Sequence, residues 1–249
     1  MVLERRCSVN YHSTVQRHLE AGHRALPLPR IATEQMSPAL DDLSIRFAAF
    51  TRNAKGVALD VGCGDGIATA AALVRGGRVL AVDPDQDALN RLLARVPSER
   101  YARLKVQTGS LPNLDFKGTR FCAVHAARVL HLLSPAAFQQ SLRKFFRWLY
   151  PSGTLFLSTL ASTGPYWSFV EREIVRRKMT QDPWPGYIAD IRRLKPAWAG
   201  ECTSIHLIDA PILRRELELA GFEIEHLSSY PLPWDADQMC CAVVARCGP

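Results

Sequence analysis

The sequence contains no uninterrupted apolar run that approaches the roughly 20 residues of a membrane-spanning helix. Its first residues carry charge, but no apolar segment of the kind found in secretory signals follows them. Both absences argue against a membrane span and favour a location in the cytoplasm. No internal repeat or low-complexity tract interrupts the chain, so its 249 residues are expected to form a single domain over 1–249.

Cysteine is present, but not in the patterns that bind metals or build disulfide frameworks. The seven cysteines are an odd number, are scattered, and include no C-x-x-C pair. Cys240 and Cys241 are adjacent on an expected strand and would point to its opposite faces. We therefore expect reduced thiols and no metal ligands.

The excess of positive charge is modest. The chain has 31 Lys and Arg against 24 Asp and Glu, a formal net charge of +7. Basic residues are densest at 172–178 and 192–195. A solvated basic helix face explains both segments more simply than binding to nucleic acid, which stays possible as a partner but is not favoured.

One stretch organises the rest of the chain, the segment 57–66 with the sequence VALDVGCGDG. Its apolar half ends in Asp60, glycines stand at alternate positions after it, and an alanine-rich segment begins at Ile67. This order predicts a buried strand, a tight turn and the start of a helix. Glycines let the backbone turn sharply and let a ligand approach the main chain. The first amides of the helix are free to face the same ligand.

The spacing of the glycines separates this turn from two other nucleotide-binding motifs. The pattern G-x-G-x-x-G would need a glycine where Ile67 stands, and no G-x-x-x-x-G-K-[ST] loop occurs. The chain instead has D-x-G-x-G-x-G. The next expected strand ends in Asp83, at the separation typical of an acidic residue that accepts hydrogen bonds from a ribose.

Strands and helices alternate from residue 57 onward, which predicts parallel pairing with right-handed crossovers. A helix before them is expected to start at Ser37-Pro38, with serine as N-cap, and to end at Lys55-Gly56. A turn is expected at 150–153. The expected strands are 57–61, 78–82, 103–107, 120–125, 154–160, 222–227 and 239–245, and the later helices are 66–75, 84–95, 135–149 and 209–220.

The glycine turn followed by Asp83 resembles the class I S-adenosylmethionine-dependent methyltransferase family. The resemblance covers about residues 55–161 and 209–246. It implies an α/β fold, a doubly wound, seven-stranded and mostly parallel sheet of strand order 3-2-1-4-5-7-6, flanked by helices and ending in an antiparallel hairpin. An N-terminal helical cap at 1–54 and an insertion at 162–208, which in this fold often forms a substrate lid, lie outside the Rossmann-like core.

The resemblance also implies S-adenosylmethionine as cofactor, with S-adenosylhomocysteine as product, and no metal. Ser110 stands where many members carry aspartate, and its hydroxyl can still bond the adenine amine. The segment 125–131 resembles the family's loop and helix after the fourth strand. The residues expected to bind the cofactor are Asp60, Gly62, Cys63, Gly64, Gly66, Asp83, Pro84, Ser110, Leu111, His125 and Ala126.

Three residues are candidates for catalysis: His131, Tyr11 and Tyr166. His131 is expected one helical turn beyond the fourth strand, where it would serve as a general base or, alternatively, only cap or pack. The tyrosines belong to the cap and to the insertion. The insertion's aromatic residues have two readings, a lid over the acceptor or a small core of its own. They are Tyr166, Trp167, Trp184, Tyr187 and Trp198.

The leading hypothesis is methyl transfer to a nitrogen or oxygen of a small-molecule acceptor. Methylation of RNA or protein is an alternative, although the [DN]-P-P-[YF] signature of enzymes that methylate amines of nucleic acids and the paired-glutamate loop of protein arginine methyltransferases are both absent. A non-catalytic regulatory subunit that binds the cofactor is a third reading. The sequence indicates neither the acceptor nor an oligomeric state.

Overall fold

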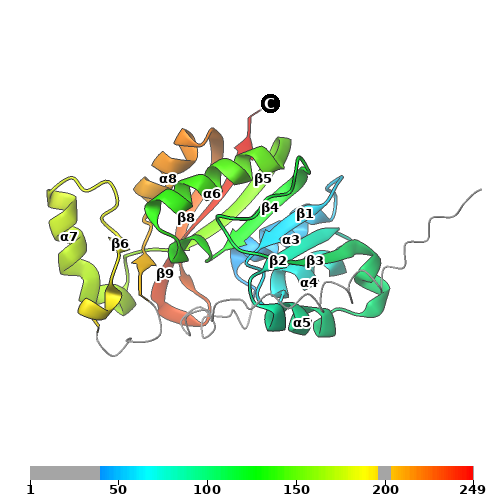
Figure 1. Ribbon diagram of the computed structural model, residues 1–249, viewed down its shortest axis with the longest axis horizontal. Helices are drawn as coiled ribbons and strands as arrows, with labels where there is room; N and C mark the ends of the chain where they lie inside the picture. The colour runs from blue at the N-terminus through cyan, green and yellow to red at the C-terminus, as the bar shows by residue number, and fades with distance from the viewer. Residues whose placement is uncertain (1–39, 196–202, 249) are drawn as a thin grey trace, which may run out of the picture.

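A seven-stranded sheet is the centre of the computed structural model, which describes residues 40–195 and 203–248 (Figure 1). The strand order is β3-β2-β1-β4-β5-β9-β8, and only β9 runs antiparallel to its neighbours β5 and β8. The strands are β1 (Ala58–Val61), β2 (Val79–Asp83), β3 (Leu104–Thr108), β4 (Phe121–Ala127), β5 (Leu149–Leu160), β8 (Phe222–Leu232) and β9 (Asp235–Cys247). This confirms the predicted fold and strand order, because β8 and β9 are the sixth and seventh strands of the core.

Helices cover both faces of the sheet. Helices α6 (Pro135–Trp148) and α8 (Ala210–Leu219) share one hydrophobic cluster with the strands, and lie in front of the sheet in Figure 1. Helices α3 (Asp42–Thr51), α4 (Ile67–Val74) and α5 (Gln86–Arg95) share a second cluster with the other face. Short 3-10 turns, η1 (Ser98–Arg103) and η2 (Leu130–Leu132), follow α5 and β4.

The expected start of the first helix was wrong. Helix α3 begins at Asp42, because the carboxylate of Asp41 accepts a hydrogen bond from the Ser44 amide and caps the helix there. The expected cap at Ser37 lies outside the described residues. The helix ends at Thr51, before the expected Lys55-Gly56. Of the cap at 1–54, the structure therefore describes only the part that contains α3.

Several strand boundaries also differ from the prediction. Strand β8 continues to Leu232, beyond the expected end at 227, and β9 begins at Asp235, before the expected start at 239. Strand β4 continues to Ala127, two residues beyond the expected end. Strand β5 begins at Leu149, so the expected turn at 150–153 lies within it. Pairing of β5 with β4 shifts register between Phe121 and Ala123, and the residues predicted as a turn are accommodated at this irregularity.

The insertion at 162–208 has its own hydrophobic cluster, which extends to Leu160 on β5, Leu232 on β8 and Cys240 on β9. Figure 1 shows α7 at one end of the molecule, away from β1, β2 and β3. Within the described part of the chain, no helix combines the length and apolarity needed to cross a membrane. The insertion's described elements are η3 (Pro165–Val170), α7 (Glu171–Met179), β6 (Tyr187–Ile188), η4 (Ile191–Arg193) and β7 (Ile205–His206).

Candidate active site

The glycine turn between β1 and α4 adopts the backbone that its sequence predicts. Gly62, Gly64 and Gly66 have φ angles of 66°, 52° and 70°, in the left-handed region that favours glycine. A Cβ on Gly62 would lie 2.3 Å from the Val129 side chain, and one on Gly66 would lie 2.2 Å from Leu92. The protein's own packing therefore requires at least two of these glycines, a reason that the sequence analysis did not foresee.

Asp83 ends β2 directly beside this turn. Its Oδ2 accepts a hydrogen bond from the Gly64 amide at 2.8 Å, and its Oδ1 accepts one from the Asp85 amide at 2.9 Å. Burial raises the pKa of this carboxyl, against the effect of the two backbone hydrogen bonds. Because each carboxylate oxygen has a second lone pair, Asp83 can still accept two hydroxyl donors. Pro84, also predicted at the site, is partly buried next to it.

Asp60 lies in a closed hydrogen-bond network rather than at the edge of an open crevice. Its Oδ2 accepts a hydrogen bond from Thr69 Oγ1 at 2.5 Å, and its Oδ1 lies 2.7 Å from His125 Nδ1. The other ring nitrogen of His125 lies 3.2 Å from Ser44 Oγ, and the ring stacks on Phe47 at 4.5 Å. The network joins β1, β4, α3 and α4, which is a structural role.

His125 and Ala126 both lie within β4, so Ala126 belongs to the strand and not to the loop expected after His125. Both side chains are buried, His125 under α3 and Ala126 in the cluster beneath α6 and α8. The side-chain contacts described above for His125 are made to the protein itself. That these two residues bind the cofactor stays a prediction.

The remaining predicted cofactor residues divide into exposed and buried ones. Ser110 is exposed after β3, whereas Leu111 packs into the cluster beneath α6. The thiol of Cys63 lies 3.5 Å from the Gly64 carbonyl, and burial, together with Asp60 and Asp83, raises its pKa well above the ordinary value. Cys63 is therefore a neutral thiol and not a reactive thiolate. Ser110 is free to meet a ligand.

His131 lies in the 3-10 turn η2, not on the helix that the sequence predicts. It is 3% exposed, and neither ring nitrogen has a hydrogen-bond partner among the described residues. Burial lowers its pKa to about 3, with smaller contributions from Arg128 and His206. The hydroxyl of Ser158, buried on β5, also lacks a partner within the described chain. Buried polar atoms are normally hydrogen-bonded, so both side chains are candidates for binding a ligand.

Tyr11 and Trp198 lie outside the described residues, and Tyr166 belongs to the insertion. The ring of Tyr166 contacts Trp167, which is fully buried in the insertion's cluster. Trp184 and Tyr187 pack edge-on against His206, with centroids at 5.1 and 5.4 Å. Tyr166 and Trp167 thus belong to the insertion's own cluster, whereas Trp184 packs on Phe138 of α6 in the main cluster. A role for Tyr166 or Tyr11 in catalysis stays a prediction.

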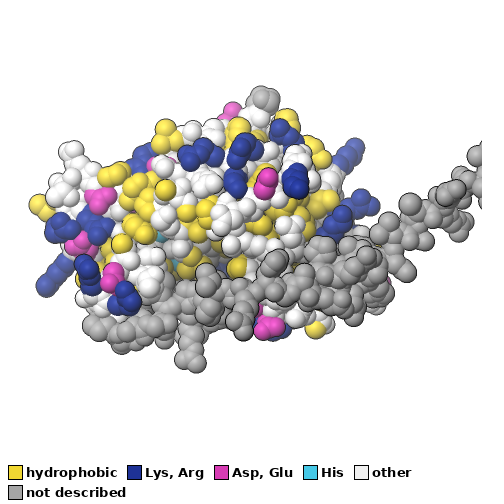
Figure 2. Space-filling model, in the orientation of Figure 1, with side chains coloured by type: hydrophobic (Ala, Val, Ile, Leu, Met, Phe, Trp, Pro, Cys, Tyr) yellow, Lys and Arg dark blue, Asp and Glu magenta, His cyan; other side chains and the backbone are white. Residues whose placement is uncertain are grey.

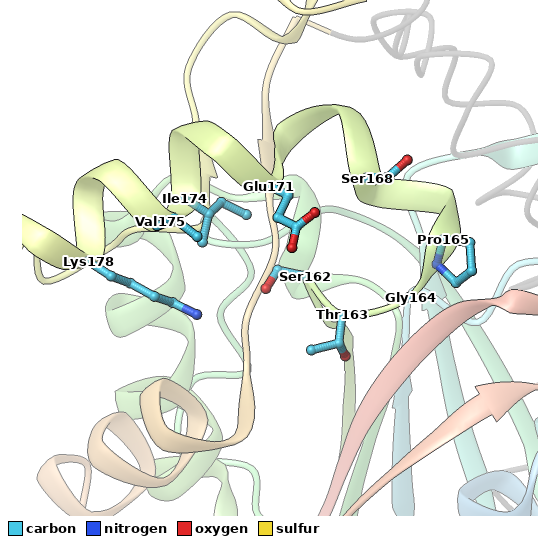
Figure 3. A pocket seen from close by; sticks show the side chains of 9 residues that line it. All are labelled: Ser162, Thr163, Gly164, Pro165, Ser168, Glu171, Ile174, Val175 and Lys178. Atoms are coloured by element: carbon cyan, nitrogen blue, oxygen red, sulfur yellow. The ribbon is translucent and has the colours of Figure 1, made fainter.

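A cavity of about 430 Å³ lies in the insertion (Figure 3). The loop after β5 and helix α7 form its walls, with Glu171, Ser162 and the Lys178 ammonium group around the opening. Lys178 Nζ lies 3.4 Å from Asp209, which also accepts hydrogen bonds from Ser162. No residue of the glycine turn lines this cavity, so it is separate from the predicted cofactor site.

Arg128, the residue that follows β4, is not among the residues predicted from the sequence. Its guanidinium lies 2.6 Å from the buried Asp41 carboxylate and 4.8 Å from the centre of the Trp234 ring. Tyr230 donates to the same Asp41 oxygen. Asp41 and Arg128 are 87 positions apart, so no local pattern marks them as partners. A non-glycine residue directly after the fourth strand with a φ of 55° is a signal that only the structure provides.

His131 and His206, both buried, make stability depend on pH. Burial lowers the pKa of His131 to about 3 and that of His206 to about 4, against an ordinary value of 6.5. Between pH 6.5 and about 4 the unfolded chain binds protons that the folded chain does not. The free energy of unfolding is therefore expected to fall as the pH drops through this window, by up to about 1.4 kcal/mol per pH unit for each histidine.

Urea unfolding at several pH values between 7 and 4.5 measures this slope. His206→Gln should make the slope shallower, whereas the same change at the exposed His226 should leave it unchanged. Equal slopes for wild type and His206→Gln would contradict the assignment.

Comparisons with known proteins agree on the domain and the fold. Residues 58–153 match a family described as a methyltransferase domain. No protein of curated function matches the sequence. An S-adenosylmethionine-dependent methyltransferase from Methanosarcina mazei is similar in structure, with a TM-score of 0.61, 18% identity, and coverage of 78% of this chain and 93% of that one.

Two further solved structures are similar. The 1,6-didemethyltoxoflavin-N1-methyltransferase of Burkholderia thailandensis, solved with 1,6-didemethyltoxoflavin and S-adenosylhomocysteine, has a TM-score of 0.61 and 20% identity, and the match covers 96% of this chain and 87% of that one. The [4+2]-cyclase SpnF has a TM-score of 0.58 and 18% identity, with 86% and 84% covered. At these identities the likeness shows the fold, not the reaction.

Proposed function

We propose that this chain, which carries a class I S-adenosylmethionine-dependent methyltransferase domain and has S-adenosylmethionine as its cofactor, methylates a nitrogen or oxygen of a small-molecule acceptor. The observation that carries the proposal is the buried ring of His131 just beyond β4, which has no hydrogen-bond partner among the residues that the structure describes. Burial lowers its pKa to about 3, so the ring is neutral at pH 7, and its one nitrogen without a hydrogen can orient an acceptor by a hydrogen bond and is a weak base for the acceptor's proton. Acceptors with an N–H or O–H group lose a proton when they are methylated.

The residues around the glycine turn fit the cofactor. The Asp83 carboxylate, fixed by the Gly64 and Asp85 amides, would hold the two ribose hydroxyls. Helix α4 has no side-chain cap at Gly66, so its first amides are available to polar groups of a ligand. The exposed Ser110 would face the adenine. When bound, S-adenosylmethionine supplies an electrophilic methyl carbon.

The chain's own residues would position the acceptor and exclude water. His131 and the Ser158 hydroxyl, one after β4 and one on β5, are the groups available to orient the acceptor and take its proton. Holding acceptor and methyl carbon in line is the main source of rate in such a displacement. The buried surroundings of His131 also keep water from the reacting atoms.

Methylation of RNA receives less support from the distribution of charge. The basic segment of α7 is partly neutralised, because Arg176 and Arg177 both pair with Glu173. In η4, Arg192 and Arg193 both lie close to Asp190. Figure 2 shows Lys and Arg side chains in separate groups with acidic side chains among them, not one continuous basic surface on this face. A solvated surface explains this arrangement.

Calorimetric titration with S-adenosylhomocysteine, with NADH as control ligand, tests the cofactor. We expect micromolar binding of the first alone. Transfer of labelled methyl groups to panels of small amines, phenols and other hydroxyl compounds, with RNA and protein panels beside them, then tests the acceptor. Labelling only of RNA or protein would overturn the proposal, and cofactor binding without any labelled product would favour a regulatory subunit.

His131→Leu is expected to lower the rate of methyl transfer by roughly 10²- to 10⁴-fold, the range of a lost general base. Binding of S-adenosylhomocysteine should be retained, because His131 is assigned to the acceptor. Single-turnover rates and calorimetry on the same preparation separate the two effects. An unchanged rate in the folded variant would exclude His131 as the base.

A further inference from the structure

A buried ion pair lies where β4 ends. Arg128 donates from one guanidinium nitrogen to Asp41 Oδ2 at 2.6 Å, and the Tyr230 hydroxyl donates to the same oxygen at 3.1 Å. The other oxygen of Asp41 accepts the Ser44 amide at 2.8 Å. The Asp41 side chain is fully buried and that of Arg128 is 11% exposed. The contacts join helix α3, the end of β4 and strand β8.

The pair is ionised but neutral as a unit. Burial opposes the charge on Asp41, yet Arg128 and the hydrogen bonds from Ser44 outweigh it and keep the carboxyl pKa below its ordinary value. Burial and the charge of Asp41 raise the pKa of Tyr230, so its hydroxyl stays a neutral donor. Asp41 is thus the residue that balances the Arg128 charge.

This pair adjoins the glycine turn. Val129, the next residue after Arg128, packs so closely on Gly62 that a Cβ there would lie 2.3 Å from it. The Arg128 amide donates to the Ser158 carbonyl of β5 at 2.9 Å. Arg128 therefore begins the segment that packs on the glycine turn and bonds to β5, at the carboxyl ends of the strands, where ligands bind in doubly wound sheets.

The cofactor and its product differ by one charge at sulfur. S-adenosylmethionine is a sulfonium cation there and S-adenosylhomocysteine is a neutral thioether, while their ribose, adenine, ammonium and carboxylate groups are the same. A buried guanidinium without a counter-charge would repel the cation and leave the product unaffected.

We propose that Asp41 neutralises Arg128 so that the site does not disfavour the cationic cofactor relative to its neutral product. Asp41 is then a residue that sets ligand preference through Arg128, without touching the ligand. The inference rests on the proposed cofactor site. Its test compares the affinities for two ligands, so contributions to binding that both ligands share cancel.

The test is the ratio of the dissociation constants of S-adenosylmethionine and S-adenosylhomocysteine, measured by calorimetry. Asp41→Asn should raise this ratio roughly tenfold, which is the effect that an unbalanced unit charge exerts over ~10 Å at an effective dielectric constant of about 20. Arg128→Gln should lower the ratio, because it leaves the carboxylate alone. The double variant should return the ratio to the wild-type value.

Tyr230→Phe is the matched control, since it removes a hydrogen bond to Asp41 without changing the charge, and its ratio should equal that of wild type. Loss of packing alone would weaken the binding of both ligands equally, and the second substitution of the double variant would not restore it. If Asp41→Asn fails to fold, Arg128→Gln and the double variant decide. This inference is overturned if the variants bind both ligands and the ratio of their dissociation constants equals that of wild type. If the wild-type chain binds neither ligand, the proposed function is overturned, and with it the cofactor site on which this inference rests.

Discussion

Replacement of Asp83 by alanine is expected to weaken binding of S-adenosylhomocysteine by about 1–3 kcal/mol, roughly a factor of 5 to 150 in the dissociation constant. Asp83 is held by two backbone amides at the end of β2, so it presents fixed acceptors to the ribose hydroxyls. An alanine removes both charge-assisted hydrogen bonds and leaves the hydroxyls without protein partners. Calorimetry on a variant whose folding has been checked by circular dichroism measures the loss.

The matched control is Asp87→Ala. Asp87 is a carboxylate in the first turn of α5, four positions further on, but its side chain is exposed. Its loss removes the same charge from the same region without touching the glycine turn, so the affinity should change little. An unchanged dissociation constant in folded Asp83→Ala would remove Asp83 from the site.

Gly66→Ala is expected to destabilise the fold by roughly 2–5 kcal/mol, from backbone strain at a positive φ together with overpacking. The φ angle of Gly66 is 70°, and a Cβ would lie 2.2, 2.8 and 3.0 Å from three atoms of Leu92. Leu92 is fully buried in α5, so it has little room to move. Urea unfolding measures the loss.

Gly118→Ala separates the two causes. Gly118 has a φ of 84°, but a Cβ there would meet nothing within 4 Å, so this variant reports the backbone strain alone. The difference between the two variants is the cost of the clash. In a Leu92→Ala background the effect of Gly66→Ala should shrink, because the clashing atoms are gone. Equal losses of unfolding free energy for Gly66→Ala and Gly118→Ala would show that the contact with Leu92 of α5 is not what requires glycine at position 66.

The sequence determined the fold, because strand and helix periodicity and turn residues are local properties of the chain. The segment 57–66 indicated a strand, a turn and a helix start, the alternation that follows predicted parallel pairing, and the resemblance to the methyltransferase family implied the strand order. It also indicated Asp83, since a residue at the carboxyl end of a neighbouring parallel strand must lie beside the turn. Predicted ends of elements were wrong where one capping residue sets the end, as Asp41 does for α3. They were also wrong where strand pairing is irregular, as between β4 and β5.

Tertiary structure alone decided which buried polar side chains have hydrogen-bond partners within the described residues and which do not. Asp60 and His125 are 65 positions apart and share a hydrogen-bond network, whereas the buried His131 ring has no hydrogen-bond partner within residues 40–195 and 203–248, although all three are ordinary polar residues in the sequence. Arg128 and Asp41 meet across 87 positions. Burial and pairing over such separations depend on how whole elements pack. They set the pKa of His131 and the charge balance at the end of β4, and no periodicity in the sequence encodes them.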